Sequence, residues 1–232
     1  MMLSLLDLFG TFIFAVSGAF RAVKYELDIL GVYVLALVTG IGGGIIRDLL
    51  IGAVPPAALM NESYFLVCIA GGLLVFLAAP HIARIWNVFL VCDALGLGVF
   101  TAVGALKGLH AGLGVAGVML TGTLTAIGGG MIRDILVREI PLVLHRDIYA
   151  TAALLGSLFL YIASRLGMPD RWILWTVIIL TTGSRLLAMR FRFRLPRVKS
   201  LPEAPSRIQE KLSAEKREKK HKRPPEDPSV RS

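Results

Sequence analysis

The chain has 232 residues, of which 55% are hydrophobic and only 18% charged, and its mean hydropathy is +0.70. A soluble domain is roughly 45–50% apolar and 25% charged, so this composition excludes an ordinary soluble protein as well as a disordered one. The net charge of +9 is concentrated at the C-terminus, because residues 191–232 contain 13 of the 25 Lys and Arg but 6 of the 16 Asp and Glu. The basic character therefore belongs to a tail, and it does not indicate a nucleic-acid-binding protein.

Seven apolar segments predict membrane-spanning helices, because about 20 apolar residues cross a bilayer core. In chain order they cover residues 3–20, 29–51, 64–79, 86–106, 113–137, 148–166 and 172–189, and the third is the shortest. No basic residue precedes the first segment and Asp7 interrupts its apolar run, so we expect a mature helix there and not a signal peptide. The sequence predicts an all-α integral membrane protein.

An odd number of spans places the two termini on opposite sides of the membrane. The Lys and Arg excess of the tail favours a cytoplasmic C-terminus and an N-terminus outside, although Lys107, Arg165 and Arg171 then fall on the outer side. The tail has too few apolar residues to form a core, so we expect it to be disordered. Contact with anionic membrane lipid is a better expectation for it than RNA binding.

An internal repeat is the strongest feature of the sequence. Residues 39–48 read TGIGGGIIRD and residues 125–134 read TAIGGGMIRD, an offset of 86 positions that also superposes Asp7 on Asp93 and Pro55 on Pro141. Each repeat has three spans, so the second must be inverted relative to the first. We predict an inverted 3+3 repeat over residues 1–82 and 83–167, a seventh transmembrane helix over 168–190 and the tail over 191–232. Such repeats place a substrate or ion path near the midplane, at the interface between them.

Both repeats carry three consecutive glycines in the middle of a span. Glycine costs about 1 kcal/mol of helix propensity relative to Ala, and unwound backbone in a membrane must face protein or a water-filled cavity. One interpretation is that the glycines break the second and fifth helices and turn carbonyls toward a passing cation, and the other is close helix packing. Duplication in inverted halves favours the first for these residues: Gly42, Gly43, Gly44, Gly128, Gly129 and Gly130.

Charged pairs follow the glycines, as Arg47-Asp48 and Arg133-Asp134. Ionisable residues at membrane depth face the bundle interior and pair with one another. Adjacent residues on a helix point about 100° apart, so Asp7 and Asp93 are the alternative partners for the arginines. A purely structural role, in which neutral buried pairs fix the helix register, stays open.

Other chemistry is not indicated by the sequence. Cys68 and Cys92 lie in apolar runs, and the three histidines near expected helix ends, His81, His110 and His145, have no Cys or carboxylate at metal-ligand spacing. Phosphate-binding, dinucleotide and zinc motifs are not found. We therefore expect no cofactor, no metal and no enzymatic activity.

The doubled Gly-Gly-Gly-x-x-Arg-Asp motif resembles the prokaryotic trimeric intracellular cation channels, a membrane family whose duplicated domain is also called a glycine-transporter domain. The resemblance covers roughly residues 3–190 and implies a homotrimer in a prokaryotic inner membrane. Each subunit would have its own pore for monovalent cations, chiefly potassium, lined by the second and fifth helices and kinked at the glycines. The Arg-Asp pairs carry over from the family motif, whereas Asp7 and Asp93 come from the repeat superposition. Neutralisation by the four aspartates would keep the arginines from blocking cations.

Two other functions stay open, because fold alone does not define function. A secondary transporter for a small solute such as glycine would share the inverted repeat and the broken helices. A membrane scaffold without transport would use the glycines for packing only.

Overall fold

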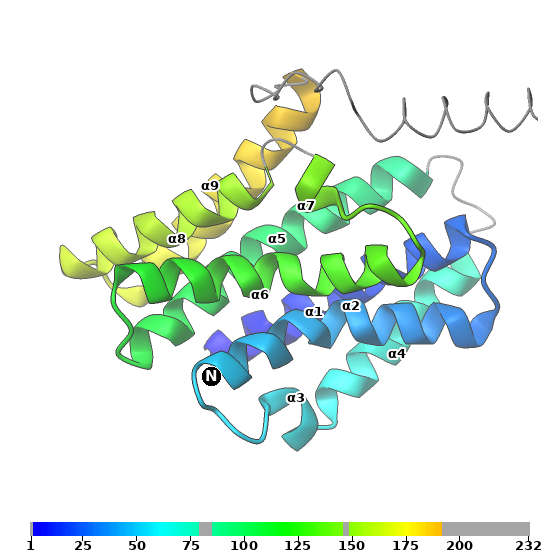
Figure 1. Cartoon of the computed structure of the whole chain (residues 1–232), viewed down its shortest axis with the longest axis horizontal. Helices are drawn as coiled ribbons and strands as arrows, with labels where there is room; N and C mark the ends of the chain where they lie inside the picture. Colours follow the sequence, from blue (N-terminus) through cyan, green and yellow to red (C-terminus); the bar gives the residue numbers. More distant parts are fainter. Residues whose placement is uncertain (1, 79–84, 146–148, 192–232) are drawn as a thin grey trace, which may run out of the picture. The chain divides into compact units, whose positions relative to one another are not determined.

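The computed structural model describes residues 2–78, 85–145 and 149–191, and in these ranges the chain is entirely helical (Figure 1). The predicted tail from residue 192 onward, as well as His81, lies outside the described residues. The helices are α1 (Met2–Lys24), α2 (Ile29–Leu50), α3 (Ala57–Met60), α4 (Ser63–Ala78), α5 (Ile85–His110), α6 (Val115–Leu136), α7 (Leu142–His145), α8 (Ala150–Arg165) and α9 (Asp170–Phe191). The predicted all-α class is confirmed.

All seven predicted spans correspond to helices. Five of these, α1, α2, α5, α6 and α9, are long and apolar enough to cross a membrane, whereas α4 and α8 have 16 residues each. The short helices α3 and α7 were not predicted. They begin directly after Pro56 and Pro141, where the fixed φ of proline suits the start of a helix.

The two repeats are inverted in space as expected. Figure 1 shows that α1 and α5 run in opposite directions, as do α2 and α6 and also α4 and α8. Phe14 of α1 and Phe100 of α5 meet edge to face, with ring centroids 5.0 Å apart. These two rings are repeat equivalents, so the pseudo-twofold axis passes between them.

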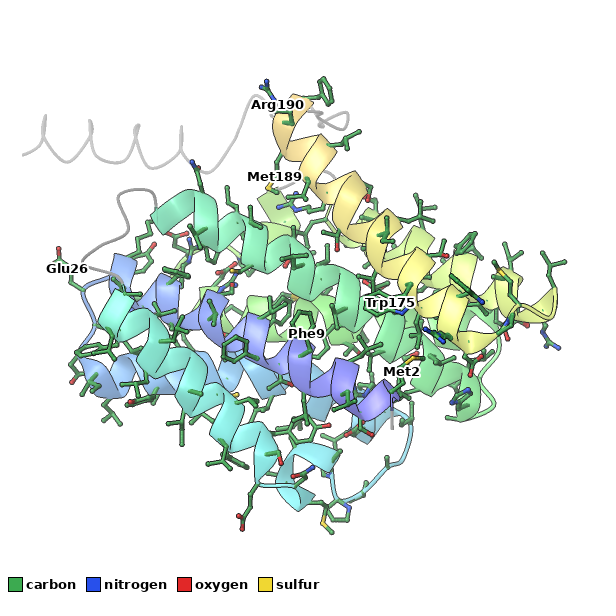
Figure 2. The ribbon with its side chains drawn as sticks, turned by 180° about the vertical axis from the view of Figure 1, so that it is seen from behind. Met2, Phe9, Glu26, Trp175, Met189 and Arg190 are labelled. Carbon is green, nitrogen blue, oxygen red and sulfur yellow. The ribbon has the colours of Figure 1, made fainter. Side chains whose placement is uncertain are left out.

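Apolar side chains cover the outside of the bundle, as a lipid-facing surface requires. Figure 2 shows Phe9 on α1 and Trp175 on α9 among them, and these side chains are 52% and 46% exposed. Trp172 and Trp175 lie within the first two turns of α9, where an aromatic belt at the membrane interface is expected.

The predicted break at the glycines is wrong, because α2 is continuous from Ile29 to Leu50 and α6 from Val115 to Leu136. A Cβ on Gly43 would fall on the backbone carbonyl oxygen of Thr125, and a Cβ on Gly129 on that of Thr39. The glycines thus let α2 and α6 cross with their backbones in direct contact, the role that small residues have at membrane helix interfaces. This contact compensates for their low helix propensity.

Candidate functional site

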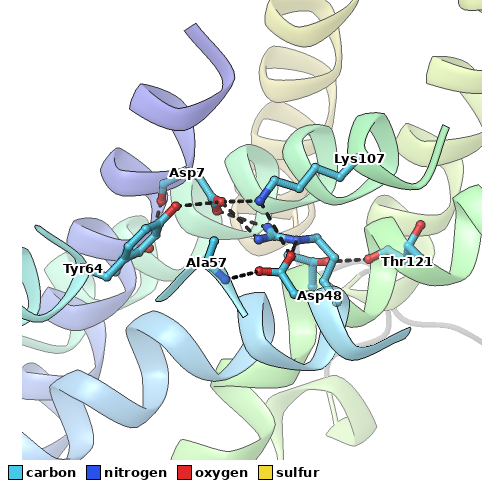
Figure 3. A network of polar contacts seen from close by, with 9 residues as sticks. Asp7, Asp48, Ala57, Tyr64, Lys107 and Thr121 are labelled. Carbon is cyan, nitrogen blue, oxygen red and sulfur yellow. Dashed lines mark hydrogen bonds and ion pairs between the residues drawn. The ribbon is translucent and has the colours of Figure 1, made fainter. Parts of the chain in front are cut away.

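The first charge network lies where α1, α2, α4 and α5 meet, and it contains Asp7, Arg47, Asp48, Tyr64 and Lys107 (Figure 3). Arg47 is 1% exposed and binds Asp7 through two parallel hydrogen bonds, Nη1 to Oδ1 and Nη2 to Oδ2, both 3.1 Å. Its Nε donates to Asp48 Oδ1 at 2.8 Å. The guanidinium is therefore held on two edges by carboxylates, the geometry in which arginine binds most strongly.

Two further donors complete the coordination of Asp7. The Tyr64 hydroxyl donates to Asp7 Oδ2 at 3.1 Å, and Lys107 Nζ donates to the same oxygen at 2.9 Å. Lys107 Nζ also lies 3.7 Å from Asp48 Oδ1. The network thus pairs two carboxylates with two cations and is neutral as a whole, as a buried cluster must be to avoid a large desolvation cost.

Asp48 also fixes the chain that follows α2. Its Oδ2 accepts a hydrogen bond of 2.9 Å from the backbone N–H of Ala57, the first residue of α3. Asp134 does the same for α7, with 2.9 Å from the N–H of Leu142 to its Oδ2. Each aspartate of the duplicated motif therefore satisfies an arginine and caps a short helix.

The second charge network repeats this arrangement at the other end of α1, where α1 meets α5 and α6. Arg133 is fully buried, and its Nε donates to Asp134 Oδ1 at 3.0 Å while its Nη1 donates to Asp93 Oδ1 at 3.0 Å and to Ser17 Oγ at 2.7 Å. The Phe89 ring lies below the guanidinium, with its centroid 4.8 Å from Cζ. Asp7 and Asp93 are thus the partners of the two arginines, as the repeat predicted, and each arginine also binds the aspartate next to it in sequence.

Each network takes one cation from the opposite repeat. Lys107 of α5 reaches Asp7 and Asp48, while Arg21 of α1 lies 3.3 Å from Asp134 Oδ1 and also binds Glu139. Positions 21 and 107 are separated by the same offset of 86 residues as the rest of the repeat. The two halves therefore exchange equivalent cations, and neither network is complete within its own repeat.

Sequence reasoning missed several of these residues, although part of the signal was present. Lys107 contributes only to the topology prediction and no role is predicted for Arg21, although the two positions are repeat equivalents. Tyr64 and Tyr149 match at an offset of 85, which requires one deletion after the prolines. Ser17 has no such signal, because the equivalent position is Val103.

A buried arginine on α9, the seventh predicted span, was also not predicted. Arg185 is 2% exposed, and its Cζ lies 4.7 Å from the ring centroid of Tyr149. His110 Nε2 lies 3.1 Å from Asp170 Oδ2 at the surface. Within residues 2–78, 85–145 and 149–191, three or more His, Cys, Asp or Glu side chains are nowhere arranged to hold a metal ion.

Together the fold and the networks define a polytopic helical membrane protein built from an inverted repeat, with its buried charges paired at both ends. A family model described as "Glycine transporter" matches residues 4–80 and again residues 90–165. The chain therefore belongs to this family, which includes the TRIC channels. A solved structure described as "Structural basis for conductance through TRIC cation channels" is 39% identical, with a TM-score of 0.79 over 87% of this chain and 99% of that one.

Two further relatives agree with this assignment. The TRIC trimeric intracellular cation channel orthologue from Rhodobacter sphaeroides is 36% identical, with a TM-score of 0.80 over 83% of this chain and 99% of that one. The UPF0126 inner membrane protein YadS of Escherichia coli K12 is 35% identical over 82% of this chain and 93% of its own length. The similarities point to a channel or transporter and not to an enzyme.

Proposed function

We propose that the chain is a channel for monovalent cations, chiefly potassium, that it assembles as a homotrimer in the inner membrane of a prokaryote, and that each subunit has its own ion path between α2 and α6. The observation that supports it most is the crossing of the two triglycine segments, which lies between the two charge networks. The likeness to the solved TRIC cation channels, at 39% identity and a TM-score of 0.79, supports the same function.

The crossing supplies what a cation path needs at its narrowest point. The glycines carry no side chain, and the nearest atoms to a Cβ on Gly43 or Gly129 are carbonyl oxygens of the opposite helix. Carbonyl oxygens can replace part of the hydration shell of a cation. Since the helices touch in this conformation, conduction requires α2 and α6 to separate there. Ile132 and Ile46 of the opposite helix cover Gly42 and Gly128, so these side chains must move with the helices. Gly44 and Gly130 lie beside the guanidinium groups of Arg47 and Arg133, where the path would meet the charge networks.

The charge networks support a cation path because they remove the positive barrier that the arginines would create. Four aspartates, Asp7, Asp48, Asp93 and Asp134, face Arg47 and Arg133 within 3.1 Å. An uncompensated arginine in a membrane path would repel cations. In this proposal, the networks flank the path and set its electrostatic potential.

A secondary transporter for a small solute such as glycine is the second candidate. The name of the matching family, "Glycine transporter", favours it, and inverted repeats of this kind are common in transporters. Discrete single-channel openings in potassium chloride would support a channel, whereas saturable exchange of labelled glycine without openings would support a carrier.

The test uses purified full-length protein in planar bilayers, with Gly43→Ala and Gly129→Ala as the variants. The added methyl group collides with a carbonyl oxygen of the opposite helix in each case, so we expect a clear change in conductance or open probability. Gly183→Ala on α9 is the matched control, because nothing lies within 4 Å of the added Cβ. If both crossing variants conduct like the control, the path does not run between α2 and α6.

A further inference from the structure

The loops that follow α2 and α6 share their backbone arrangement but differ in one side chain. The third residue after each helix donates its backbone N–H to the carbonyl oxygen of the motif aspartate: Ala53 to Asp48 at 2.8 Å, and Glu139 to Asp134 at 2.9 Å. Positions 53 and 139 are repeat equivalents, with the offset of 86 residues. A carboxylate therefore stands beside the second network where the first has only a methyl group.

Glu139 joins the loop after α6 to the end of α1. Its Oε2 accepts a hydrogen bond from Arg21 Nη2, and its Oε1 accepts one of 3.5 Å from Lys24 Nζ. The Arg21 side chain is fully buried, and its Cζ lies 5.7 Å from the ring centroid of Tyr25 and 5.3 Å from that of Phe89. The Glu139 side chain is 36% exposed. The contact thus has one buried partner and one that water can reach.

Close contacts at glycines make two helix pairs, α1 with α2 and α5 with α6. A Cβ on Gly18 of α1 would fall 2.3 Å from the Leu35 carbonyl oxygen of α2. A Cβ on Gly104 of α5 would fall 2.4 Å from Thr125 Oγ1 of α6. Helices packed this closely move together. Separation of α2 from α6 therefore breaks the polar contacts that join one helix pair to the other.

These contacts between the pairs differ at the two ends. At the first network, Lys107 of α5 binds the aspartates of α1 and α2. At the second, Arg21 of α1 binds Asp134 of α6, and Glu139 adds ion pairs to Arg21 and Lys24. The first end lacks these additional pairs because its equivalent loop residue is Ala53.

We propose that Glu139 is a latch that holds the second end of the ion path closed, and that its release from Arg21 and Lys24 accompanies the opening of this end. The inference rests on the proposed function, because it takes the path to run between α2 and α6. Glu139 is a positioning residue that acts through the loop after α6. A contact shifts an equilibrium only by the difference in its free energy between the two states, and this one exists in the closed state.

The test is single-channel recording of the purified full-length protein in planar bilayers, with Glu139→Gln as the variant. Glutamine keeps the size of the side chain but lacks the charge that binds Arg21 and Lys24. We expect the ratio of open to closed time to rise roughly fivefold, the upper end of what a partly exposed ion pair supplies, at unchanged single-channel conductance. Glu62→Gln is the matched control, because Glu62 is exposed in the loop before α4 and should leave the ratio unchanged.

Ala53→Glu tests the latch in the opposite direction. The repeat equivalents of Arg21 and Lys24 are Lys107 and His110, so a carboxylate on the loop after α2 meets a cation at the first network. Ala53 is exposed, which leaves room for the longer side chain. We expect the ratio of open to closed time to fall below that of Ala53→Gln, a control of the same size without the charge.

An unchanged ratio in Glu139→Gln would overturn the proposal, and so would equal ratios in Ala53→Glu and Ala53→Gln. A merely stabilising contact predicts a lower unfolding temperature for Glu139→Gln and the wild-type ratio in the channels that do fold. If Glu139→Gln does not fold, the two variants at Ala53 decide. A wild-type protein without openings would contradict the proposed function and the latch together, whereas a conducting wild type with insensitive variants would contradict the latch alone.

Discussion

The balance of charge in the first network predicts a large loss of stability when Asp7 is neutralised. In Asp7→Asn, the side chain keeps its shape, but Arg47 and Lys107 then face Asp48 alone. Asp7 and Arg47 are each 1% exposed, so the uncompensated charge stays in a low-dielectric environment. Breaking a buried pair in this way costs about 3–5 kcal/mol, and we expect a loss of that size in the free energy of unfolding.

Removing the charge of Lys107 as well should recover much of the lost free energy of unfolding. Lys107→Met alone leaves one excess negative charge and should cost about 1–2 kcal/mol, because the Lys107 side chain is 21% exposed and water screens part of the effect. Asp7→Asn combined with Lys107→Met is neutral again. We expect the double variant to be more stable than the sum of the single changes predicts, by at least about 1 kcal/mol.

Equilibrium unfolding of the purified protein in mixed detergent micelles measures these differences. Lys24→Met is the matched control, since Lys24 and Glu139 are 3.5 Å apart with side chains 42% and 36% exposed. Exposed pairs contribute about 0–1 kcal/mol, so this change should be small. Additive effects in the double variant, or a cost for Asp7→Asn no larger than that of the control, would refute the reasoning.

Three further results are expected. Arg138 has φ +57°, and the equivalent residue of the first repeat is Gly52 with φ +74°. Glycine adopts this left-handed conformation without steric cost, so Arg138→Gly should raise the free energy of unfolding by about 0.5–1 kcal/mol. A clear decrease in the same assay would contradict this prediction. A cysteine at Ser229 should resist an impermeant thiol reagent in intact cells and react after lysis, whereas labelling of intact cells would reverse the proposed orientation. Native mass spectrometry in mild detergent should show trimers, and monomers alone in several detergents and in lipid would count against the proposed assembly.

The helices and their inversion could be predicted because both depend on local composition and on the repeat. Apolar length defines the spans, and the offset of 86 residues relates Asp7 to Asp93 before any contact is known. The same offset also identified the partners of Arg47 and Arg133. These inferences succeeded because they required only that buried charges pair and that an odd number of spans inverts the second repeat.

The state of the glycine segments could not be predicted, because it depends on the opposite helix. Glycine propensity alone favours a break, but the contact of Gly43 with the Thr125 carbonyl is a tertiary feature. The short helices α3 and α7 were missed because their four residues give no periodic pattern, and their starts depend on Asp48 and Asp134. The contact of Ser17 with Arg133 has no counterpart in the other network, because the residue equivalent to Ser17 is Val103, and the repeat therefore did not predict it.

The aromatic pair on the pseudo-twofold axis has a consequence for how the protein is made. Phe14 fills the space left by Gly96, and Phe100 packs against Gly10, so each repeat supplies the ring that the other accommodates. When the ribosome has completed only the first three spans, Phe14 has no cavity to enter and Arg21 has no Asp134 to bind. The first half therefore cannot complete its packing around Phe14 and Arg21 during synthesis, and these contacts form only once α5 and α6 have been inserted.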